Sequence, residues 1–357
     1  KGGNTAYIRP GRNVAGFQRG SVELQKSNPF VGTGAVYVNV VDNKKILDNQ
    51  KYKIVFQDTG IVSKTSNWSL LKIKSNNQVD TLIKNSGDFY SPSKIYDGIT
   101  VSVLPDKVEV DTNSKVIDMP GNTPKVQIQV YEDNEAKYNG YPNPANYQFE
   151  FSTELTQSIP DTISEGEVPS SQAPFKVKNL TSGKYIDFVY YINDGSISTQ
   201  HIIWFKEYLK GKYVRTWHII LTYDKNQGAP AVQLPSSGKI SFKTKKPFIK
   251  SDTLYFTTIA PKIDNNKAKS ELDLIKVVPN PYVVTHEAEP KLSSFVTSGR
   301  GERFIRFTHV PYQAKISIFT VRGELVKTLY QDDMYNGDVK WNLRTEENLD
   351  VAFGVYI

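Results

Sequence analysis

Apolar and polar positions alternate along most of this chain. In residues 51–58 (KYKIVFQD), Tyr52, Ile54 and Phe56 fall on one side, and residues 98–105 (GITVSVLP) alternate in the same way. Successive side chains of a β-strand point to opposite faces, so a period of two indicates a strand with one buried face. The strand-like segments show no sustained helical period of 3.6 residues. The pattern therefore predicts an all-β fold.

Polar turns divide these segments into hairpins. Residues 68–85 predict one hairpin, because Asn76-Asn77 can supply the positive φ angles of a tight turn. Residues 175–192 predict another, which turns at Ser182-Gly183. From residue 275 onward, turn signals recur about every 8–12 residues, the spacing of an all-β sandwich. We therefore expect tandem immunoglobulin-like or fibronectin-like β-sandwich domains.

The order of strand-rich and polar segments predicts five parts. They are an extended arm or the end of a preceding domain (1–34), a β-sandwich module (35–119), a larger β-sandwich module (120–262), a linker (263–274) and a C-terminal immunoglobulin-like domain (275–357). We expect one helical turn in the linker, at Lys269–Asp273.

Two features bear on how the modules are related. Residues 51–83 and 146–192 share an aromatic strand followed by a hairpin, which favours two related sandwiches, although any two antiparallel sandwiches share such a pattern. Whether residues 35–262 form one domain or two stays open. Pro, Ser and acidic residues are concentrated at 160–174, where we expect an exposed loop.

The composition limits the classes of function. The 357 residues include 44 Lys and Arg against 37 Asp and Glu, and the net charge of +7 is scattered along the chain. This balance argues for solubility and against a dedicated nucleic-acid surface. The densest basic run, 239–250, is expected to be an exposed strand face, with contact to phosphate or anionic polysaccharide as the alternative. Cysteine is absent, which excludes disulfides and thiolate chemistry.

The ends of the chain suggest processing. No apolar run reaches the ~18–20 residues of a membrane helix, and no signal peptide is visible. The chain begins at Lys1 without Met and stops at Ile357 on a strand-like run. We expect a mature or trimmed product whose natural chain continues beyond Ile357.

No set of residues has the spacing of a catalytic or metal site. The histidines are His201, His218, His286 and His309, and the HEAEP run at 286–290 lacks the second His of a zinc-protease motif. Glu165 and Glu167 fall in the expected loop, where their pKa values would be ordinary. The acidic run at 332–338 is better explained by a hairpin turn at Asn336-Gly337 than by calcium. We therefore expect no catalytic residue, metal or cofactor, and a protein that is not an enzyme.

The stretch 275–284 (IKVVPNPYVV) breaks a Val- and Ile-rich strand with Pro279, Asn280 and Pro281. Proline cannot donate to a β-ladder and asparagine suits a turn, so we expect a rigid corner after a short edge strand. Further on, residues 316–329 (ISIFTVRGELVKTL) alternate and turn at Arg322-Gly323.

This ordered set resembles the C-terminal sorting domain of type IX secretion system cargo and the related immunoglobulin-like domain of flagellar hook-capping proteins. The matching positions are Pro279, Asn280 and Pro281, residues 306–308, Val310-Pro311, the 316–326 hairpin with Gly323, then Trp341, and finally Gly354, Val355 and Tyr356. The resemblance covers about the last quarter of the chain, and it implies export by the type IX machinery. The upstream modules resemble β modules of large bacterial surface proteins at the level of fold.

Two positions depart from the family pattern. The family has Gly before its last strand, whereas this chain has ENLD at 347–350, so we expect Asn348 to adopt the left-handed conformation there. The last strand is cut at Ile357, so the export signal would be incomplete. The triplets around Thr81, Thr162 and Thr253 (DTL, DTI and DTL) resemble the O-glycosylation motif of the same bacterial group.

Together these observations predict a secreted, cell-surface-associated, non-catalytic structural protein. Its expected partners are other copies of itself, other surface proteins and the type IX secretion machinery, with polysaccharide as a further candidate and neither nucleic acid nor a transmembrane segment. An arm such as residues 1–30 could add a strand to a neighbour's exposed edge and so polymerise the chain, which deletion of residues 1–34 would test. The alternative is an accessory region of a larger exported hydrolase, either a spacer or a carbohydrate-binding part in which exposed aromatic residues stack on sugars.

Overall fold

The computed structural model describes residues 12–58, 64–120, 126–132, 140, 142–163, 166–195, 198–209, 211–224, 234–283, 289 and 301–357. Antiparallel strands dominate these ranges, and their one α-helix, α1 (Asn265–Ser270), is short. The predicted all-β fold is confirmed. Within the same ranges, no helix is long and apolar enough to cross a membrane.

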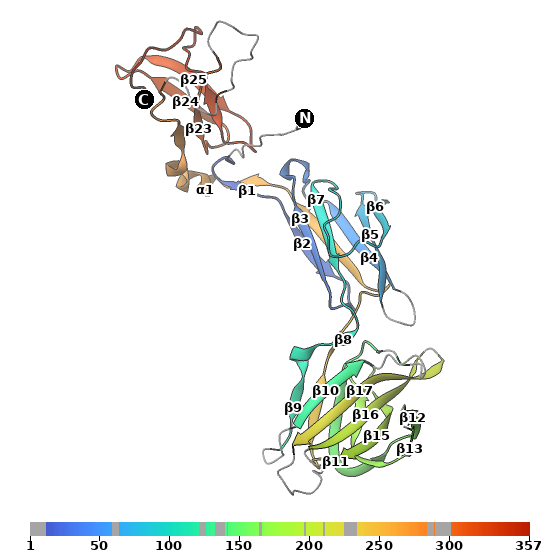
Figure 1. Ribbon diagram of the computed structural model, residues 1–357. Helices are drawn as coiled ribbons and strands as arrows, with labels where there is room; N and C mark the ends of the chain where they lie inside the picture. The colour runs from blue at the N-terminus through green and yellow to red at the C-terminus, as the bar shows by residue number, and fades with distance from the viewer. Residues whose placement is uncertain are drawn as a thin grey trace, which may run out of the picture.

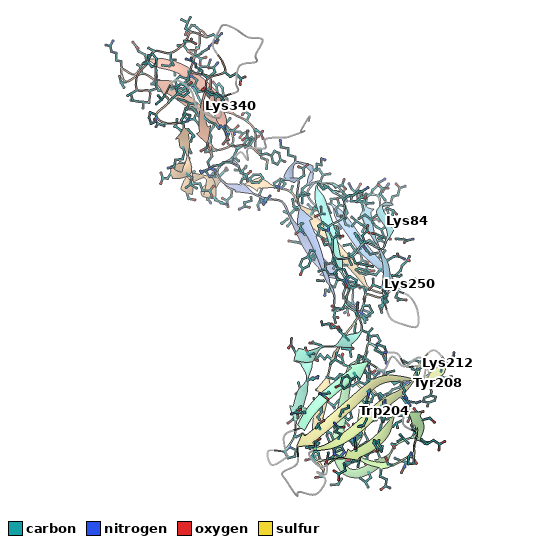
Figure 2. All side chains as sticks on the ribbon, viewed as in Figure 1. Lys84, Trp204, Tyr208, Lys212, Lys250 and Lys340 are labelled. Atoms are coloured by element: carbon teal, nitrogen blue, oxygen red, sulfur yellow. The ribbon has the colours of Figure 1, made fainter. Side chains whose placement is uncertain are left out.

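The strands form three bodies that lie in a row (Figure 1). In the middle is the central sandwich, which contains β2 to β7 and β20. On one side of it lies the inserted sandwich, which contains β9 to β18, and on the other side lies the C-terminal module, which contains β22 to β26. Lys84, Lys212 and Lys340 mark the three bodies in Figure 2.

The central sandwich has two layers. One layer follows the order β2 (Ser21–Lys26), β20 (Thr253–Ile259), β4 (Lys51–Asp58), β5 (Thr65–Ile73) and β6 (Val79–Ser86), and the other pairs β3 (Ala35–Val40) with β7 (Ile99–Leu104). Tyr52, Ile54 and Phe56 are at most 2% exposed in the core between the layers, as their alternation predicted. Burying a side chain of this size stabilises the fold by about 1.5–3 kcal/mol.

The position of β20 corrects the predicted domain boundaries. The sequence places residues 253–259 in the second module, but this strand pairs with β2 on one side and β4 on the other. The residues between β7 and β20 are therefore an insertion into the central sandwich. The predicted arm is also wrong from residue 12 onward, because Val14 and Ala15 are fully buried and β2 belongs to the sheet. These pairings join residues far apart in the chain, which local periodicity cannot reveal.

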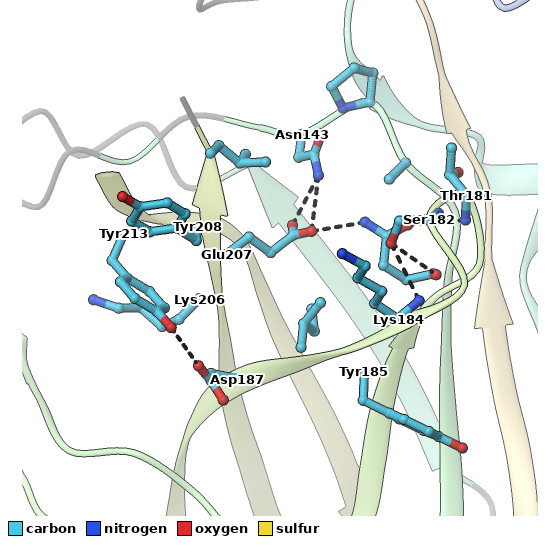
Figure 3. Close-up of a pocket in the computed structure, with 15 residues that line it drawn as sticks. Asn143, Thr181, Ser182, Lys184, Tyr185, Asp187, Lys206, Glu207, Tyr208 and Tyr213 are labelled. Carbon is cyan, nitrogen blue, oxygen red and sulfur yellow. Dashed lines mark hydrogen bonds between the residues drawn. The ribbon is translucent and has the colours of Figure 1, made fainter. Parts of the chain in front are cut away.

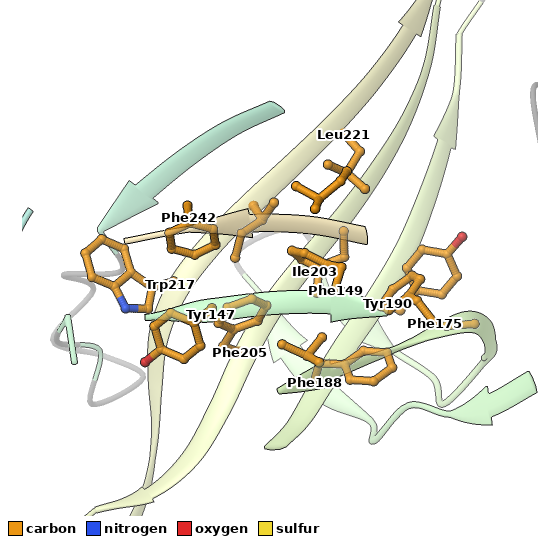
Figure 4. Close-up of a cluster of buried hydrophobic side chains, with 14 of the residues drawn as sticks. Tyr147, Phe149, Phe175, Phe188, Tyr190, Ile203, Phe205, Trp217, Leu221 and Phe242 are labelled. Atoms are coloured by element: carbon orange, nitrogen blue, oxygen red, sulfur yellow. The ribbon is translucent and has the colours of Figure 1, made fainter. Parts of the chain in front are cut away.

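The inserted sandwich is one strongly curved eight-stranded sheet. Its order is β10 (Val126–Glu132), β17 (Lys212–Asp224), β16 (Ser198–Leu209), β15 (Lys184–Asp194), β14 (Gln172–Asn179), β11 (Tyr147–Gln157), β18 (Gly238–Phe242) and β9 (Val116–Asp118). Strands distant in this order share one aromatic core (Figure 4), where the ring centroids of Phe205 and Phe242 lie 6.3 Å apart. The insertion begins before the predicted boundary at 120, since β9 pairs with β18.

Two further expectations about this unit are corrected. The central and inserted sandwiches differ in strand order, so the sequence echo between them reflects a shared strand-and-hairpin pattern and not a structural repeat. In the predicted loop at 160–174, β12 (Asp161–Ile163) and β13 (Gly166–Val168) form a hairpin. Val168 is buried there with Val189 and Trp204. The residues that pack against this hairpin lie on other strands, so the local sequence does not reveal them. The polar composition of residues 160–174 therefore suggested a loop.

Paired ribbons connect the three bodies. β8 (Glu109–Val110) pairs with β19 (Thr244–Lys245) at the inserted sandwich, and β1 (Phe17–Gln18) pairs with β21 (Lys262–Ile263) towards the C-terminal module. Helix α1 follows β21 and is capped by the Asp264 carboxylate. Within the described ranges, 3-10 turns lie at Asn43–Lys45, Thr112–Ser114 and Leu272–Leu274. The predicted helical turn at Lys269–Asp273 is wrong in extent, because it spans the end of α1 and the start of the last of these turns.

The C-terminal module is a small sandwich. One layer orders β22 (Lys276–Val278), β23 (Ile305–Thr308) and β26 (Val339–Trp341), and the other pairs β24 (Ala314–Phe319) with β25 (Leu325–Gln331). Ile318, Val326 and Trp341 are buried between the layers. The strand-like run at 351–357 forms no continuous ladder: the Val351 N–H donates to the Leu343 carbonyl at 3.2 Å, Tyr356 bridges Thr320, and the backbone of residue 357 pairs with that of residue 319.

Candidate functional site

A cavity of about 560 Å³ opens at one end of the inserted sandwich (Figure 3). Its walls come from the loop at 143–145, the β14–β15 turn at 179–184, the start of β15 at 185–187, and the paired ends of β16 and β17 at 206–209 and 213. The volume falls within the range of about 300–1,000 Å³ that is typical of ligand pockets.

Glu207 lines this cavity and is 6% exposed. Because it lies on the core-facing side of β16, its carboxylate needs polar partners to remain buried. Asn143 Nδ2 donates to both carboxylate oxygens at 3.0 and 3.1 Å, and Asn179 Nδ2 donates to Oε1 at 2.8 Å. The hydroxyls of Tyr147 and Thr216 donate to Oε2 at 2.6 and 2.8 Å. Four side chains from separate segments therefore meet at one carboxylate.

Every one of these donors to Glu207 is neutral. Tyr147 keeps its proton, because burial, and then the charge of Glu207, raise the pKa of its phenol well above the usual value. A carboxylate offers about four acceptor positions, and the hydrogen bonds present here occupy them. Glu207 therefore organises the cavity wall and is not placed to act as a base or a nucleophile.

Asn179 links Glu207 to the β14–β15 turn. Its Oδ1 accepts hydrogen bonds from the backbone N–H groups of Thr181 and Ser182, both at 3.0 Å. Gly183 adopts a φ of 72°, a left-handed conformation that glycine accepts without strain. This is the turn that the sequence predicted. It leaves the Lys184 side chain at the cavity, where its ammonium has no hydrogen-bond partner in the described part of the chain.

Three exposed tyrosines form the rim of the cavity. Tyr208 and Tyr213 pair across β16 and β17, with ring centroids 5.3 Å apart and planes at 61°. They are 64% and 54% exposed, and Tyr185 on the other rim is 55% exposed. The phenol of Tyr213 donates to Asp187 Oδ2 at 3.2 Å, and that of Tyr185 donates to Glu150 Oε2 at 2.7 Å. Each carboxylate raises the pKa of its tyrosine through that hydrogen bond.

A charged cluster lies beside the tyrosine pair. Asp161 Oδ2 accepts hydrogen bonds from Lys206 Nζ at 2.8 Å and from Arg215 Nε at 3.0 Å, and Arg215 is 2% exposed. Burial alone would raise the pKa of Asp161, but the hydrogen bonds from Lys206, the Thr162 backbone and Arg215 hold it below its usual value. Lys206, which lines the cavity, therefore shares one carboxylate with Arg215.

Two histidines of the inserted sandwich, the buried His201 and the half-buried His218, lie among aromatic rings. His201 is 2% exposed, and its Nδ1 lies 2.8 Å from the Tyr190 hydroxyl. His218 stacks on Trp204 with ring centroids 4.8 Å apart. Burial, and then the charge of Arg215, lower the pKa of His218 to about 4. Both side chains thus take structural positions in strands.

Of the other histidines and glutamates considered as candidate site residues, those that the structure describes do not lie together. His309 lies at the junction with the C-terminal module, and His286 and Glu165 fall outside the described residues. Glu167 is exposed in β13. In the ranges that the structure describes, no group of three or more His, Cys, Asp or Glu side chains could hold a metal ion.

The acidic run at 332–338 forms turns of its own. Asp333 accepts a hydrogen bond from the Tyr335 backbone at 2.8 Å, and Asp338 binds Arg306 at 3.1 Å. The sequence suggested that Gly337 serves a hairpin turn, but the structure gives a different reason for this glycine. A side chain there would come within 2.6 Å of the Asn13 carbonyl oxygen, so glycine is needed for the close approach of the N-terminal segment.

The residues of the sorting-type motif occupy defined structural positions. Pro279 directly follows β22, and Asn280 and Pro281 continue the bend, so the strand ends where the sequence predicted. Gly323 has a φ of 84° in the β24–β25 turn, and Asn348 has a φ of 64°, the left-handed conformation that was expected of it.

The closing residues of that motif pack on one another. Trp341 is 2% exposed, and its Nε1 donates to the Arg344 carbonyl at 3.0 Å. The ring of Tyr356 lies edge-on to Trp341, with centroids 5.5 Å apart. Gly354 is exposed and has open space where a side chain would lie, so packing does not explain its glycine.

The three candidate O-glycosylation residues differ in accessibility. Thr162, in β12, and Thr81, in β6, are exposed. Thr253 is half-buried in β20, between two neighbouring strands. Its neighbour Asp252 is fully buried and binds backbone N–H groups, which gives this triplet a structural role.

Sequence reasoning did not single out the cavity. A signal for it was present, because the alternation of Ile203 and Phe205 on the core side of β16 places Glu207 on that side as well. A charged residue in a core position predicts a local polar network. Its partners, such as Asn143 and Asn179, come from loops that only the fold brings together.

No protein-family model matches the sequence, and no curated protein matches it. Two solved structures are similar at low scores. One is the flagellar hook junction protein FlgK from Burkholderia pseudomallei (12% identity, 73% of this chain and 46% of that chain, TM-score 0.18). The other is PorZ, described as an essential bacterial surface component of the type-IX secretion system of Porphyromonas gingivalis (12% identity, 85% of this chain and 48% of that chain, TM-score 0.17). The chain spans about half the length of each, and similarity at this level defines no shared function.

Proposed function

We propose that this chain is a non-catalytic structural protein of the bacterial cell surface, whose β-sandwich bodies form a stiff spacer or assembly subunit. One observation carries the proposal: two antiparallel segments of the chain, and not one, cross each junction between bodies. Domains joined by a single linker move relative to one another by default, whereas paired segments bend only together.

The junction with the inserted sandwich is extensively bonded. Thr33 N–H donates to the Lys246 carbonyl at 2.9 Å, and Lys246 N–H donates to Thr33 Oγ1 at 2.7 Å. The Lys246 ammonium reaches Asn146 Oδ1, in the inserted sandwich, at 2.8 Å. Phe248 is fully buried and stacks on Phe56 of the central core with ring centroids 4.2 Å apart. Lys246 and Phe248 thus connect both bodies.

The junction with the C-terminal module is bonded from the N-terminal side. Gly16 N–H donates to Glu271 Oε2 at 2.7 Å, and the same oxygen lies 3.2 Å from His309 Nε2. The backbone N–H of Gly337 donates to the Arg12 carbonyl at 2.8 Å. Bending at this junction would break several hydrogen bonds, each worth about 0.5–1.5 kcal/mol.

The stiffness can be measured directly. The chain has no cysteine, so Lys84→Cys, Lys212→Cys and Lys340→Cys introduce unique spin-label sites on the three bodies. We expect narrow distance distributions by pulsed double electron–electron resonance for the 84–212 and 84–340 pairs. Broad distributions for both pairs would show hinged bodies and would contradict a stiff spacer.

The surface location has its own test. Intact cells that carry the full gene are treated with an added protease, and the protein is followed with antibody. We expect it to be digested while a cytoplasmic marker survives. Electron microscopy of the native material would then show whether it forms filaments or layers, and dispersed single particles would argue for a spacer over an assembly subunit.

Export by a type IX-like route is part of the proposal. It is supported by the resemblance of residues 275–357 to sorting domains and by the ordered positions of Pro279, Gly323 and Trp341 in that module. In a bacterium with a type IX system, a periplasmic reporter fused to the complete C-terminal module is expected to reach the medium or the surface. Retention of the fusion in the periplasm would contradict this route.

Polymerisation by strand addition would use an exposed edge. β6 is the outer strand of the five-stranded layer, and Val79 on it is 45% exposed. The donor cannot be the whole segment 1–34, because β2 already pairs within the chain, so a test deletes residues 1–11 alone. We expect weaker self-association by analytical ultracentrifugation, and unchanged association would remove these residues as the donor.

A further inference from the structure

We propose that the cavity rimmed by Tyr185, Tyr208 and Tyr213 binds a neutral polysaccharide chain. This goes beyond the structural role, because it gives the inserted sandwich a ligand of its own. The rim, the floor and the charge of the cavity each support the proposal.

The rim presents aromatic faces that are exposed and already oriented. Tyr208 and Tyr213 are both more than half exposed, and their rings brace each other edge to face at 5.3 Å. The hydrogen bond from Tyr213 to Asp187 holds the ring in place, and the bond from Tyr185 to Glu150 does the same on the opposite rim. Restrained side chains lose less conformational entropy when they bind a ligand.

Such faces suit a pyranose ring. The flat side of a sugar presents C–H groups of partial positive charge, and the face of an aromatic ring carries partial negative charge. Figure 3 shows Tyr208 and Tyr213 on one side of the cavity and Tyr185 on the other. A chain of several sugar units can therefore contact aromatic rings at both rims while it lies over the cavity.

The groups between the rims suit hydroxyls, each of which both donates and accepts. Asp187 supplies a carboxylate acceptor and Lys184 supplies an ammonium donor. The Thr181 hydroxyl, whose oxygen accepts from the Asn146 backbone N–H at 3.0 Å, still has its proton to donate. The turn that carries Thr181, Ser182 and Lys184 is fixed through Asn179, so these groups are held before a ligand arrives.

The charge of the cavity favours a neutral ligand. Lys206 shares the Asp161 carboxylate with Arg215, and the Glu207 carboxylate keeps its negative charge because all of its hydrogen-bond donors are neutral. Among the described lining residues, two cations (Lys184 and Lys206) are therefore balanced by two carboxylates (Asp187 and Glu207). No excess charge is present to select a polyanion. A proline-rich peptide also docks on aromatic side chains, but the polar groups between these rims match hydroxyls better than an apolar peptide face.

The test uses the full chain and isothermal titration calorimetry. The probes are five neutral hexasaccharides (cellohexaose, xylohexaose, mannohexaose, maltohexaose and chitohexaose), with heparin and a decaproline peptide as the competing ligands. We expect at least one neutral hexasaccharide to bind with a Kd of about 1 mM or tighter. Tyr208→Ala and Tyr213→Ala should each weaken that binding about tenfold.

Matched variants distinguish the loss of binding at this cavity from the effect of removing any exposed tyrosine. Tyr37→Ala removes a tyrosine that is also 54% exposed but lies in β3 of the central sandwich, and it should leave binding unchanged. Tyr213→Phe keeps the ring and loses only the bond to Asp187, so it should keep most of the affinity. The proposal is overturned if no neutral hexasaccharide binds, if only heparin or decaproline binds, or if binding survives replacement of both Tyr208 and Tyr213.

Discussion

His309 Nε2 lies 3.2 Å from Glu271 Oε2, and the same carboxylate oxygen accepts a hydrogen bond from the Gly16 backbone at 2.7 Å. The other ring nitrogen of His309 lies 2.9 Å from the Asn13 carbonyl oxygen. One carboxylate and one imidazole thus tie the N-terminal segment, the segment after α1 and the C-terminal module together. The bond from Gly16 is the main cause that lowers the pKa of Glu271.

Replacing Glu271 tests this junction. Glu271→Ala removes the acceptor of the Gly16 N–H and the partner of His309, so the C-terminal module should move more freely. We expect the distance distribution between labels at 84 and 340 to broaden, while that between 84 and 212 stays narrow. Glu347→Ala, which removes an exposed glutamate of the same module, serves as control and should change neither.

The opposite junction depends on Asp252. This residue is fully buried, and its carboxylate accepts hydrogen bonds from the backbone of Val31, Gly32 and Ile249 at 2.7, 2.9 and 3.1 Å. Asp252→Ala leaves those N–H groups without an acceptor, at a cost of about 1–3 kcal/mol for each group that stays buried and unpaired.

Asp252→Ala should change the two distance distributions in the opposite way to Glu271→Ala. The 84–212 distribution is expected to broaden and the 84–340 distribution to stay narrow. Asp252→Asn keeps one acceptor oxygen and should give an intermediate width. Equal broadening at both junctions would mean that the central sandwich itself had loosened.

Glu207 is expected to be costly to replace. Glu207→Leu would leave the donors on Asn143, Asn179, Tyr147 and Thr216 without their shared acceptor, and a buried unpaired polar group costs about 1–3 kcal/mol. We expect a loss of at least about 3 kcal/mol of unfolding free energy in urea. Glu207→Gln, which keeps one carbonyl oxygen, should lose less. Equal losses for the two variants would show that the shape of the side chain matters and its acceptors do not.

His218 should make stability depend on pH. Its pKa is lowered from 6.5 to about 4 in the folded chain, so between these values the unfolded chain takes up a proton that the folded chain does not. The free energy of unfolding is therefore highest above pH 6.5, and it decreases as the pH falls from 6.5 towards 4. His218→Phe keeps a ring beside Trp204 and removes the titration, so its unfolding free energy should fall less over this range.

An NMR titration checks the same assignment. The imidazole signals of His218 should move with a midpoint near pH 4. A midpoint near 6.5 would mean that the ring is solvated, against its burial beside Trp204 and Arg215.

Several parts of the fold follow from local pattern. The strand at 51–58 and the turns at Asn77 and Gly183 depend on side-chain alternation and on residues that tolerate positive φ, and both properties belong to short stretches of chain. The candidate site does not follow in this way. Tyr208 and Tyr213 are near neighbours on one hairpin, but Asn143 and Glu207 meet only because the sheet curves.

By itself, the sequence determined that this protein is all β, and it located several of the strands and tight turns. Those properties depend on residues within reach of one another along the chain. Only the tertiary structure decided that β20 returns to the central sandwich, that residues 12–18 bind near the C-terminal module, and that three exposed tyrosines surround one cavity. These features arise from pairings between distant segments, whose free energy depends on the packing of the whole chain and leaves no local periodicity to detect.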